Sequence, residues 1–191
     1  MLTFPAGSRG YFTVVGTDPG THTLGLGALH VDMRSFKLVG FEAYTLVATK
    51  LMSDDDLLVA THGHVHARVC AHKKAIVRHL QHLRPSAVAS EDAFFNRRFP
   101  GAYAPLLQSI NAIREAVKEY NPFLPFTLIE PSVVKVAVGA KGGGNNKTLV
   151  LDGIKAIKEF DVPTPTPLNT LSEHAVDSLA IAYARLKQMR S

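Results

Sequence analysis

The chain has 191 residues, of which 46% are hydrophobic and 19% are charged, and its formal net charge is +5. This is the profile of a soluble globular protein with a sizeable core. No uncharged apolar stretch is long enough to span a bilayer, the first residues lack the pattern of a signal peptide, and a single cysteine, Cys70, excludes an intrachain disulfide framework. We therefore expect a cytoplasmic protein without a membrane partner.

The positive charge is concentrated in the second half of the chain. Residues 96–191 hold twelve Lys and Arg against eight Asp and Glu, whereas residues 1–95 hold nine against eight. A basic balance is typical of proteins that bind nucleic acid, although many basic proteins do not.

The first half of the chain predicts three strands followed by a long helix and a short strand. Apolar runs with turn residues between them predict strands over 13–18, 23–31 and 35–46. A helix is expected over about 56–83, because Arg84-Pro85 ends it. "AVASED", residues 87–92, is typical of a short buried strand.

The second half is predominantly helical. We expect helices over 103–120, 131–138 and 147–160, a strand over 125–130 and a loop over 139–146. The final helix begins near Leu171, with Thr170 as N-cap and Glu173 at N3 forming a capping box. This order predicts an α/β fold, a mixed five-stranded sheet with helices on both faces. Residues 1–191 form one domain in this interpretation, with an N-terminal extension over 1–12 and a Pro-rich connector over 161–169.

Four polar side chains are expected at one end of this sheet. Asp18 ends the first strand and Glu91 ends the strand after the long helix. His174 and Asp177 are three residues apart near the start of the last helix, so they share a face. Such an oxygen-rich set suits Mg²⁺ or Mn²⁺, and two such ions can promote phosphodiester hydrolysis.

Four segments resemble the RuvC family of Holliday-junction resolvases, in the ribonuclease H-like superfamily. They are "GTDPGTHTLGLG", "ASEDAFFNRR", "PSVVKVAVGAKGGGNNKTLV" and "EHAVDSLAIAYARL", in the family's order and spacing. The resemblance implies a ribonuclease H-like fold and a homodimer with two active sites. It also implies Mg²⁺-dependent hydrolysis of DNA at four-way junctions, in a bacterial or virus-infected bacterial cytoplasm, and it leaves open whether other branched DNA is cut.

The resemblance also implies the roles of individual residues. Asp18, Glu91, His174 and Asp177 match the family's catalytic, metal-binding positions, with two Mg²⁺ ions per site that Mn²⁺ can replace. Five further residues are expected to contact DNA. Phe94 matches the aromatic at the junction centre, with Phe95 as the alternative wedge; Lys135 and Lys147 match basic residues near the scissile phosphate, and Arg97 and Arg98 are candidate phosphate binders.

Several of these sequence features also allow other interpretations. Phe94 and Phe95 could both belong to the core, and six histidines between residues 62 and 82 could be either a polar helix face or a metal tract. The loop before Lys147 lacks the Gly-Lys of a phosphate-binding P-loop, so no nucleotide cofactor is expected. The competing functions are a non-catalytic junction-binding protein and a relative of the actin-like ATPases and sugar kinases. The apolar face of helix 103–120 is a candidate for the dimer contact.

Overall fold

A five-stranded mixed sheet forms the centre of the molecule. The structure is a computed structural model that describes residues 10–52, 57–94, 100–140, 148–162 and 164–190. The sheet has the order β3-β2-β1-β4-β5; its strands are β1 (Tyr11–Asp18), β2 (Thr23–Asp32), β3 (Leu38–Val47), β4 (Ala87–Glu91) and β5 (Phe126–Ile129). The meander β1-β2-β3 is antiparallel, whereas β4 runs parallel to both β1 and β5. The predicted mixed five-stranded sheet is confirmed.

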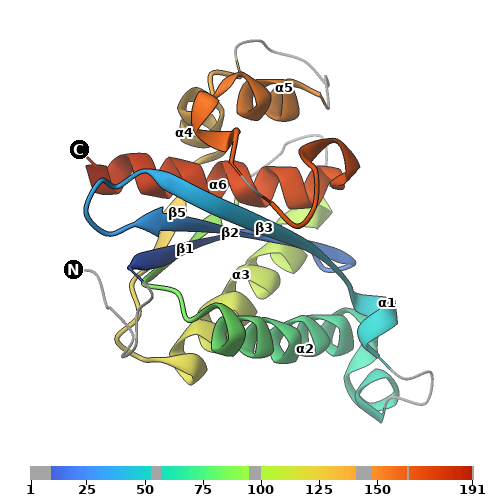
Figure 1. Cartoon of the computed structure of the whole chain (residues 1–191). Coiled ribbons are helices and arrows are strands. Elements are labelled where there is room, and N and C mark those ends of the chain that lie inside the picture. Colours follow the sequence, from blue (N-terminus) through green and yellow to red (C-terminus); the bar gives the residue numbers. More distant parts are fainter. Residues whose placement is uncertain (1–9, 53–56, 95–99, 141–147, 163, 191) are drawn as a thin grey trace.

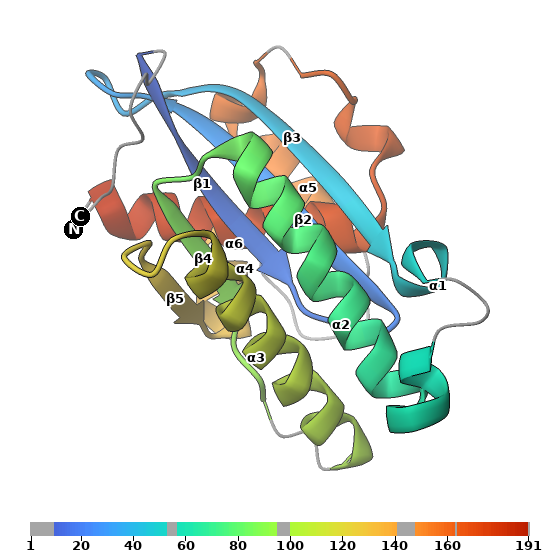
Figure 2. The same cartoon turned by 90° about the horizontal axis from the view of Figure 1, so that it is seen from below.

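Helices cover both faces of this sheet, as predicted. One face carries α2 (Leu57–Leu83) and α3 (Tyr103–Tyr120), which lie side by side below the strands (Figures 1 and 2). The other face carries α6 (Glu173–Arg190), with α4 (Pro131–Ala137) and α5 (Leu149–Ala156) beyond it (Figure 1). The short α1 (Ala48–Leu51) follows β3 directly. Among these described helices, none combines the length and hydropathy that crossing a membrane would require.

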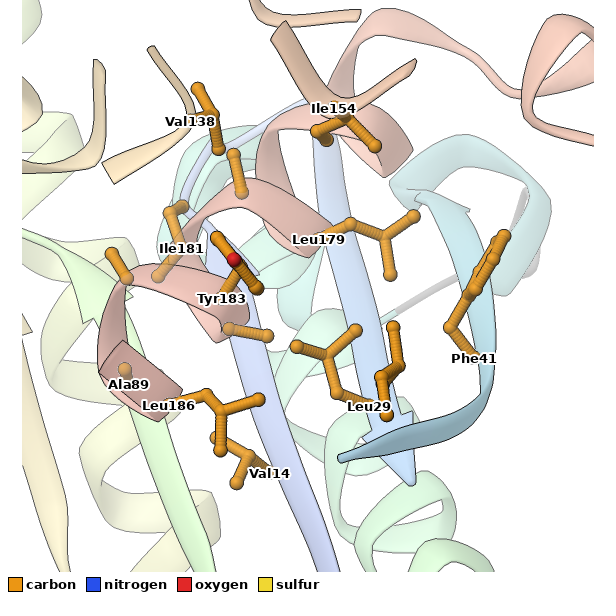
Figure 3. Close-up of a cluster of buried hydrophobic side chains, with 14 of the residues drawn as sticks. Val14, Leu29, Phe41, Ala89, Val138, Ile154, Leu179, Ile181, Tyr183 and Leu186 are labelled. Carbon is orange, nitrogen blue, oxygen red and sulfur yellow. The ribbon is translucent and has the colours of Figure 1, made fainter. Parts of the chain in front are cut away.

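The two faces of the sheet bury separate apolar clusters, because successive side chains of each strand point to opposite faces. On the α6 side, Val14 and Leu29 of the sheet pack with Leu179 and Leu186 of the helix (Figure 3). On the other side, Val15, Leu26 and Ala28 pack with residues of α2 and α3. Both faces of β1 and β2 are therefore buried, which explains their nearly continuous apolar sequence.

The turn between β2 and β3 is longer than predicted. The Asp32 carboxylate accepts hydrogen bonds from the backbone N–H groups of Arg34 at 3.1 Å and Ser35 at 2.7 Å. These bonds hold residues 33–37 in a turn, so β3 begins at Leu38 instead of residue 35. Next to this turn, β1 begins at Tyr11, and Tyr11 and Phe12 of the expected N-terminal extension pair with Asp32 and Val31 of β2.

Three helix predictions also need correction. Gly63 has φ 81° and ψ 165°, so α2 consists of two helical segments. The helix expected over 147–160 is α5 followed by an extended Ile157 and a 3₁₀ turn, Lys158–Phe160. Ser172 caps α6 in place of Thr170, because its hydroxyl accepts a hydrogen bond from the Ala175 N–H at 3.2 Å. Thr170 instead donates to the carbonyl of Pro167.

Candidate active site

Two carboxylates lie at the same end of the sheet. Asp18 is the last residue of β1 and Glu91 the last of β4. These two strands are parallel, and Thr17 lies opposite Ser90. The next residues, Asp18 and Glu91, therefore lie at the same end of the sheet. The Asp18 side chain is only 14% exposed. The sequence prediction that two strand-end acids converge is therefore reproduced in the fold.

Helix α6 places two further polar side chains at this end of the sheet. His174 lies in its first turn, and His174 Nδ1 is 2.6 Å from Asp18 Oδ2, which joins the helix to β1. Asp177 lies one turn further on, and its charge and that of Asp18 both act on Glu91. Three chain segments remote in sequence thus contribute to one polar cluster, defined here as Asp18, Glu91, His174 and Asp177.

Glycines of β1 and β2 determine how closely α6 approaches the sheet. A Cβ atom on Gly25 would lie 1.9 Å from the carbonyl oxygen of His174, and one on Gly16 would lie 2.2 Å from that of Ser178. At Gly27 the nearest atom would be the backbone nitrogen of Leu179, at 2.7 Å. Any larger side chain would push the helix away. The sequence "GLG" in β2 is therefore the local reason that His174 and Asp177 reach the level of Asp18.

The negative charge of Asp18 disfavours ionisation of the two other carboxylates of the cluster, Glu91 and Asp177. Burial, and then the charges of Asp18 and Asp177, raise the pKa of Glu91 to about 7. Burial, and then the charge of Asp18, likewise raises the pKa of Asp177 to about 7. The hydrogen bond to Asp18 raises the pKa of His174, which favours an imidazolium–carboxylate pair. Such a site holds excess negative charge that a bound cation would compensate.

The donor chemistry of the cluster fits a hard divalent cation. Carboxylate oxygens from Asp18, Glu91 and Asp177 are the ligands that Mg²⁺ and Mn²⁺ prefer, and a neutral imidazole can join them. In the part of the chain that the structure describes, no three His, Cys, Asp or Glu side chains are already spaced as a coordination sphere. The fit therefore rests on the identity and mutual repulsion of the donors, with Asp18 paired to His174.

One of the expected DNA-contacting lysines lies near the cluster. Lys135, in α4, lowers the pKa of both Glu91 and Asp177 through its charge, so its ammonium group is close enough to act on them. The aromatic Phe94 follows β4 and is 54% exposed, which argues against a core position. Phe95, Arg97, Arg98 and Lys147 lie outside the described residues.

The turn after Asp18 is anchored by three helices. Ser109 of α3 donates to the Gly20 carbonyl at 3.2 Å, and the Ala48 N–H of α1 donates to the His22 carbonyl at 2.9 Å. Arg68 of α2 contacts the His22 ring. The contact of Ser109 was not predicted, because a serine on the mostly apolar face of a helix carries no signal of a long-range contact.

The histidines of α2 do not share one environment. His72 is 1% exposed and lies against the Gly20 and Leu46 carbonyls without a hydrogen bond of normal geometry. His62, His64 and His66 are exposed.

Helix α3 differs from expectation, since Ile110, Ile113 and Val117 of its apolar face are buried within the chain's own core. Leu107, near the start of the same face, is 36% exposed, so only the beginning of α3 presents apolar surface for the predicted dimer contact.

Comparisons with known proteins agree with this architecture. No family model matches the chain. The crossover junction endodeoxyribonuclease RuvC of Thermus thermophilus is 31% identical over 180 residues, which cover 91% of this chain and 95% of that protein. A structure of T. thermophilus RuvC in complex with Holliday junction substrate has a TM-score of 0.66 at 23% identity, covering 94% of this chain and 96% of the other. The yeast mitochondrial Holliday junction resolvase Ydc2 has a TM-score of 0.62 at 12% identity, covering 93% and 78%.

Proposed function

Because the chain belongs to the RuvC family of crossover junction endodeoxyribonucleases, we propose that it is a structure-selective DNA endonuclease. Its substrate is a four-way junction, and possible further substrates are other branched DNAs. The observation that carries this proposal is the convergence of Asp18, Glu91, Asp177 and His174 at one end of the family's fold. The whole of residues 1–191 would act as one nuclease domain inside the cell.

The chemistry proposed is metal-dependent hydrolysis of a phosphodiester. Asp18, Glu91 and Asp177 would hold two Mg²⁺ ions, with Mn²⁺ as a substitute, and His174 would be a fourth ligand or a proton carrier. When bound, Mg²⁺ would supply the positive charge that stabilises the leaving oxygen and acidifies the attacking water. Because Asp18 engages His174 Nδ1, a proton exchanged with the reaction would pass through Nε2.

The basic and aromatic residues around the cluster would bind the DNA. Lys135 is placed to offset charge beside Glu91 and Asp177, which suits a contact to the scissile phosphate. Phe94 is exposed three residues after Glu91, which suits a wedge at the junction centre. We extend the phosphate-binding role to Lys147 from the family resemblance, and to Arg97 and Arg98 from their sequence position just after Phe94.

A homodimer completes the proposal. A four-way junction has near two-fold symmetry, and two incisions placed symmetrically need two sites related in the same way. The contact would use surface outside the buried part of α3, and the exposed Leu107 at the start of that helix is a candidate for it. Neither a nucleotide cofactor nor a membrane enters the proposed reaction.

The test is incubation of the protein with a labelled four-way junction, with Mg²⁺ or with chelator. We expect paired nicks that require Mg²⁺. The Asp177→Asn variant should bind the junction without cutting it, while Asp152→Asn, on the exposed surface of α5, serves as the matched control and should cut normally. A gel shift without nicks by the unmodified protein would instead favour a non-catalytic junction-binding protein, and ATP turnover would favour the actin-like class.

A further inference from the structure

A pocket lies at the end of the sheet opposite to the candidate active site. Its volume is about 840 Å³, and the β2–β3 turn, the 3₁₀ turn Lys158–Phe160 and the end of α6 line it. Asp18 pairs with Gly25, whereas Tyr11 pairs with Asp32, the residue just before this turn. The pocket is therefore a whole strand away from the carboxylate cluster, roughly 23 Å at the usual rise per residue.

The lining combines an apolar floor with a basic rim. Phe36, Leu38, Val162 and Met189 supply the apolar surface. The rim carries three cations and one anion, namely Lys37, Lys158, Arg190 and Glu159. A pocket of this volume can bury an aromatic or large aliphatic side chain.

Glu159, the one acid among the described residues that line the pocket, is already neutralised. Arg190 Nη2 lies 2.6 Å from Glu159 Oε2, and the Arg190 guanidinium also donates to the Phe36 carbonyl, with Nε at 3.1 Å. The ammonium groups of Lys37 and Lys158 have no ion pair with any residue described in the structure. Two uncompensated positive charges thus remain beside the apolar floor.

The pocket wall is held in a strained backbone conformation. Phe36 has φ 56°, which a bulky residue adopts only when its surroundings impose it. Its ring packs edge-on against Phe12 with centroids 5.3 Å apart, and its carbonyl is fixed by Arg190. Such strain is found preferentially at binding sites. It is a second observation, independent of the charge distribution, that points to the same place.

We propose that this pocket binds an acidic peptide segment of another protein, one large apolar side chain of which enters the pocket while flanking carboxylates face Lys37 and Lys158. The positive charges of the rim favour an acidic ligand. The apolar floor favours an apolar side chain over a phosphodiester backbone, because a charged phosphate would lose water there without gaining a polar contact. The location leaves the carboxylate cluster free. The inference therefore does not depend on the nuclease proposal.

The probe is a fluorescent peptide, Asp-Asp-Leu-Phe-Asp-Asp, titrated with the full chain and followed by anisotropy. We expect a Kd on the order of 100 µM, typical of a short transient contact. Combined Lys37→Glu and Lys158→Glu substitutions, both at exposed positions, should weaken binding about tenfold or more. Lys74→Glu makes the same kind of substitution once, at an exposed position of α2 across the sheet, and should have little effect.

Methyl NMR locates the peptide independently of affinity. The chain has four methionines, so the methyl spectrum is simple. The Met189 methyl in the pocket should shift on titration, whereas Met52, which follows α1 at the other end of the sheet, should not.

Several results would overturn the proposal. These are no binding at 1 mM peptide (about tenfold above the expected Kd), equal binding of a peptide with Ser in place of Leu and Phe, or equal weakening by Lys74→Glu. Displacement of the peptide by a DNA duplex would assign the surface to nucleic acid. A peptide-sensitive dimer on light scattering, with Met189 unshifted, would assign it to a second copy of the chain.

Discussion

His174 Nδ1 lies 2.6 Å from Asp18 Oδ2, although the two residues are 156 positions apart. This contact joins the first strand to the last helix at the point where the carboxylates converge. Asp18 also raises the pKa of three neighbouring groups, those of His174, Glu91 and Asp177. Asp18 is therefore the electrostatic centre of the cluster, and the predictions begin with it.

Asp18→Asn should abolish cleavage and preserve junction binding. The amide keeps the size of the side chain but removes a charge that a divalent ion needs, so we expect the single-turnover rate to fall about a hundredfold or more. Binding should be equal or tighter, because one repulsion with phosphate is lost. Asp32→Asn, in the β2–β3 turn at the other end of β1, is the matched control. Normal nicking by the Asp18 variant would remove this residue from the mechanism.

Gly25→Ala should displace α6. The added methyl would lie 1.9 Å from the His174 carbonyl, so either the helix or the strand must move. We expect a loss of about 3 kcal/mol in the free energy of unfolding, measured by urea denaturation, together with a loss of cleavage. Gly101→Ala is the control, because no atom lies within 4 Å of its added methyl. Equal stability of the two variants would show that close packing at Gly25 is dispensable.

His72 should make the fold less stable in acid. Burial lowers the pKa of His72 below the ordinary value of 6.5, so the folded state resists a proton that the unfolded state accepts. Its contribution to stability is complete above pH 6.5 and falls as the pH drops below that value, by at most about 1.4 kcal/mol per pH unit.

The measurement for His72 is urea unfolding between pH 7.5 and 5, compared with His72→Leu. The leucine variant lacks this proton linkage, so the stability difference between the two proteins should change with pH in favour of leucine on the acid side. His64→Leu, at an exposed position, should leave the pH dependence unchanged. Parallel curves for the native protein and His72→Leu would mean that His72 takes up its proton equally in both states.

Lys135→Ala should weaken junction binding and reduce its salt dependence. Loss of one phosphate contact lowers the slope of log K against log salt by about one. Lys74→Ala, exposed on the opposite face, is the control. Lys147→Ala is expected to behave like Lys135→Ala. An unchanged slope for either variant would show that the altered lysine does not contact phosphate.

Phe94→Ala should impair distortion of the junction while leaving the salt slope intact. Stacking of an aromatic ring on a base contributes about 1–3 kcal/mol, without release of counterions. A fluorescent base analogue at the junction centre should report less unstacking with this variant. Phe123→Ala, at an 83% exposed position between α3 and β5, controls for loss of any surface aromatic. An identical signal from native protein and Phe94→Ala would leave Phe94 without a role at the junction centre.

The sequence pattern was informative wherever the relevant contacts are local. Period-two and helical patterns placed Asp18 and Glu91 at strand ends and put His174 and Asp177 on one helix face. The sequence pattern was insufficient where one residue makes a long-range contact, or where it ends a helix or strand that the neighbouring residues favour. Asp32 extends a turn into an apolar run, Gly63 interrupts a helical pattern, and Ser109 reaches the turn after Asp18 from a distant helix. The close approach of α6 to the sheet could not be predicted from the sequence, because it depends on which backbone atom of the helix lies over each glycine.

The position of α6 against β1 also determines when the site can exist during synthesis. Asp18 leaves the ribosome early, but its partners His174 and Asp177 emerge about 156 residues later. A nascent chain can form the β1-β2-β3 hairpins and still lack half of the polar cluster. The pairing of such distant segments is also slow, because a long loop must close first. An incomplete chain therefore lacks the assembled polar cluster until the helix that completes it has docked.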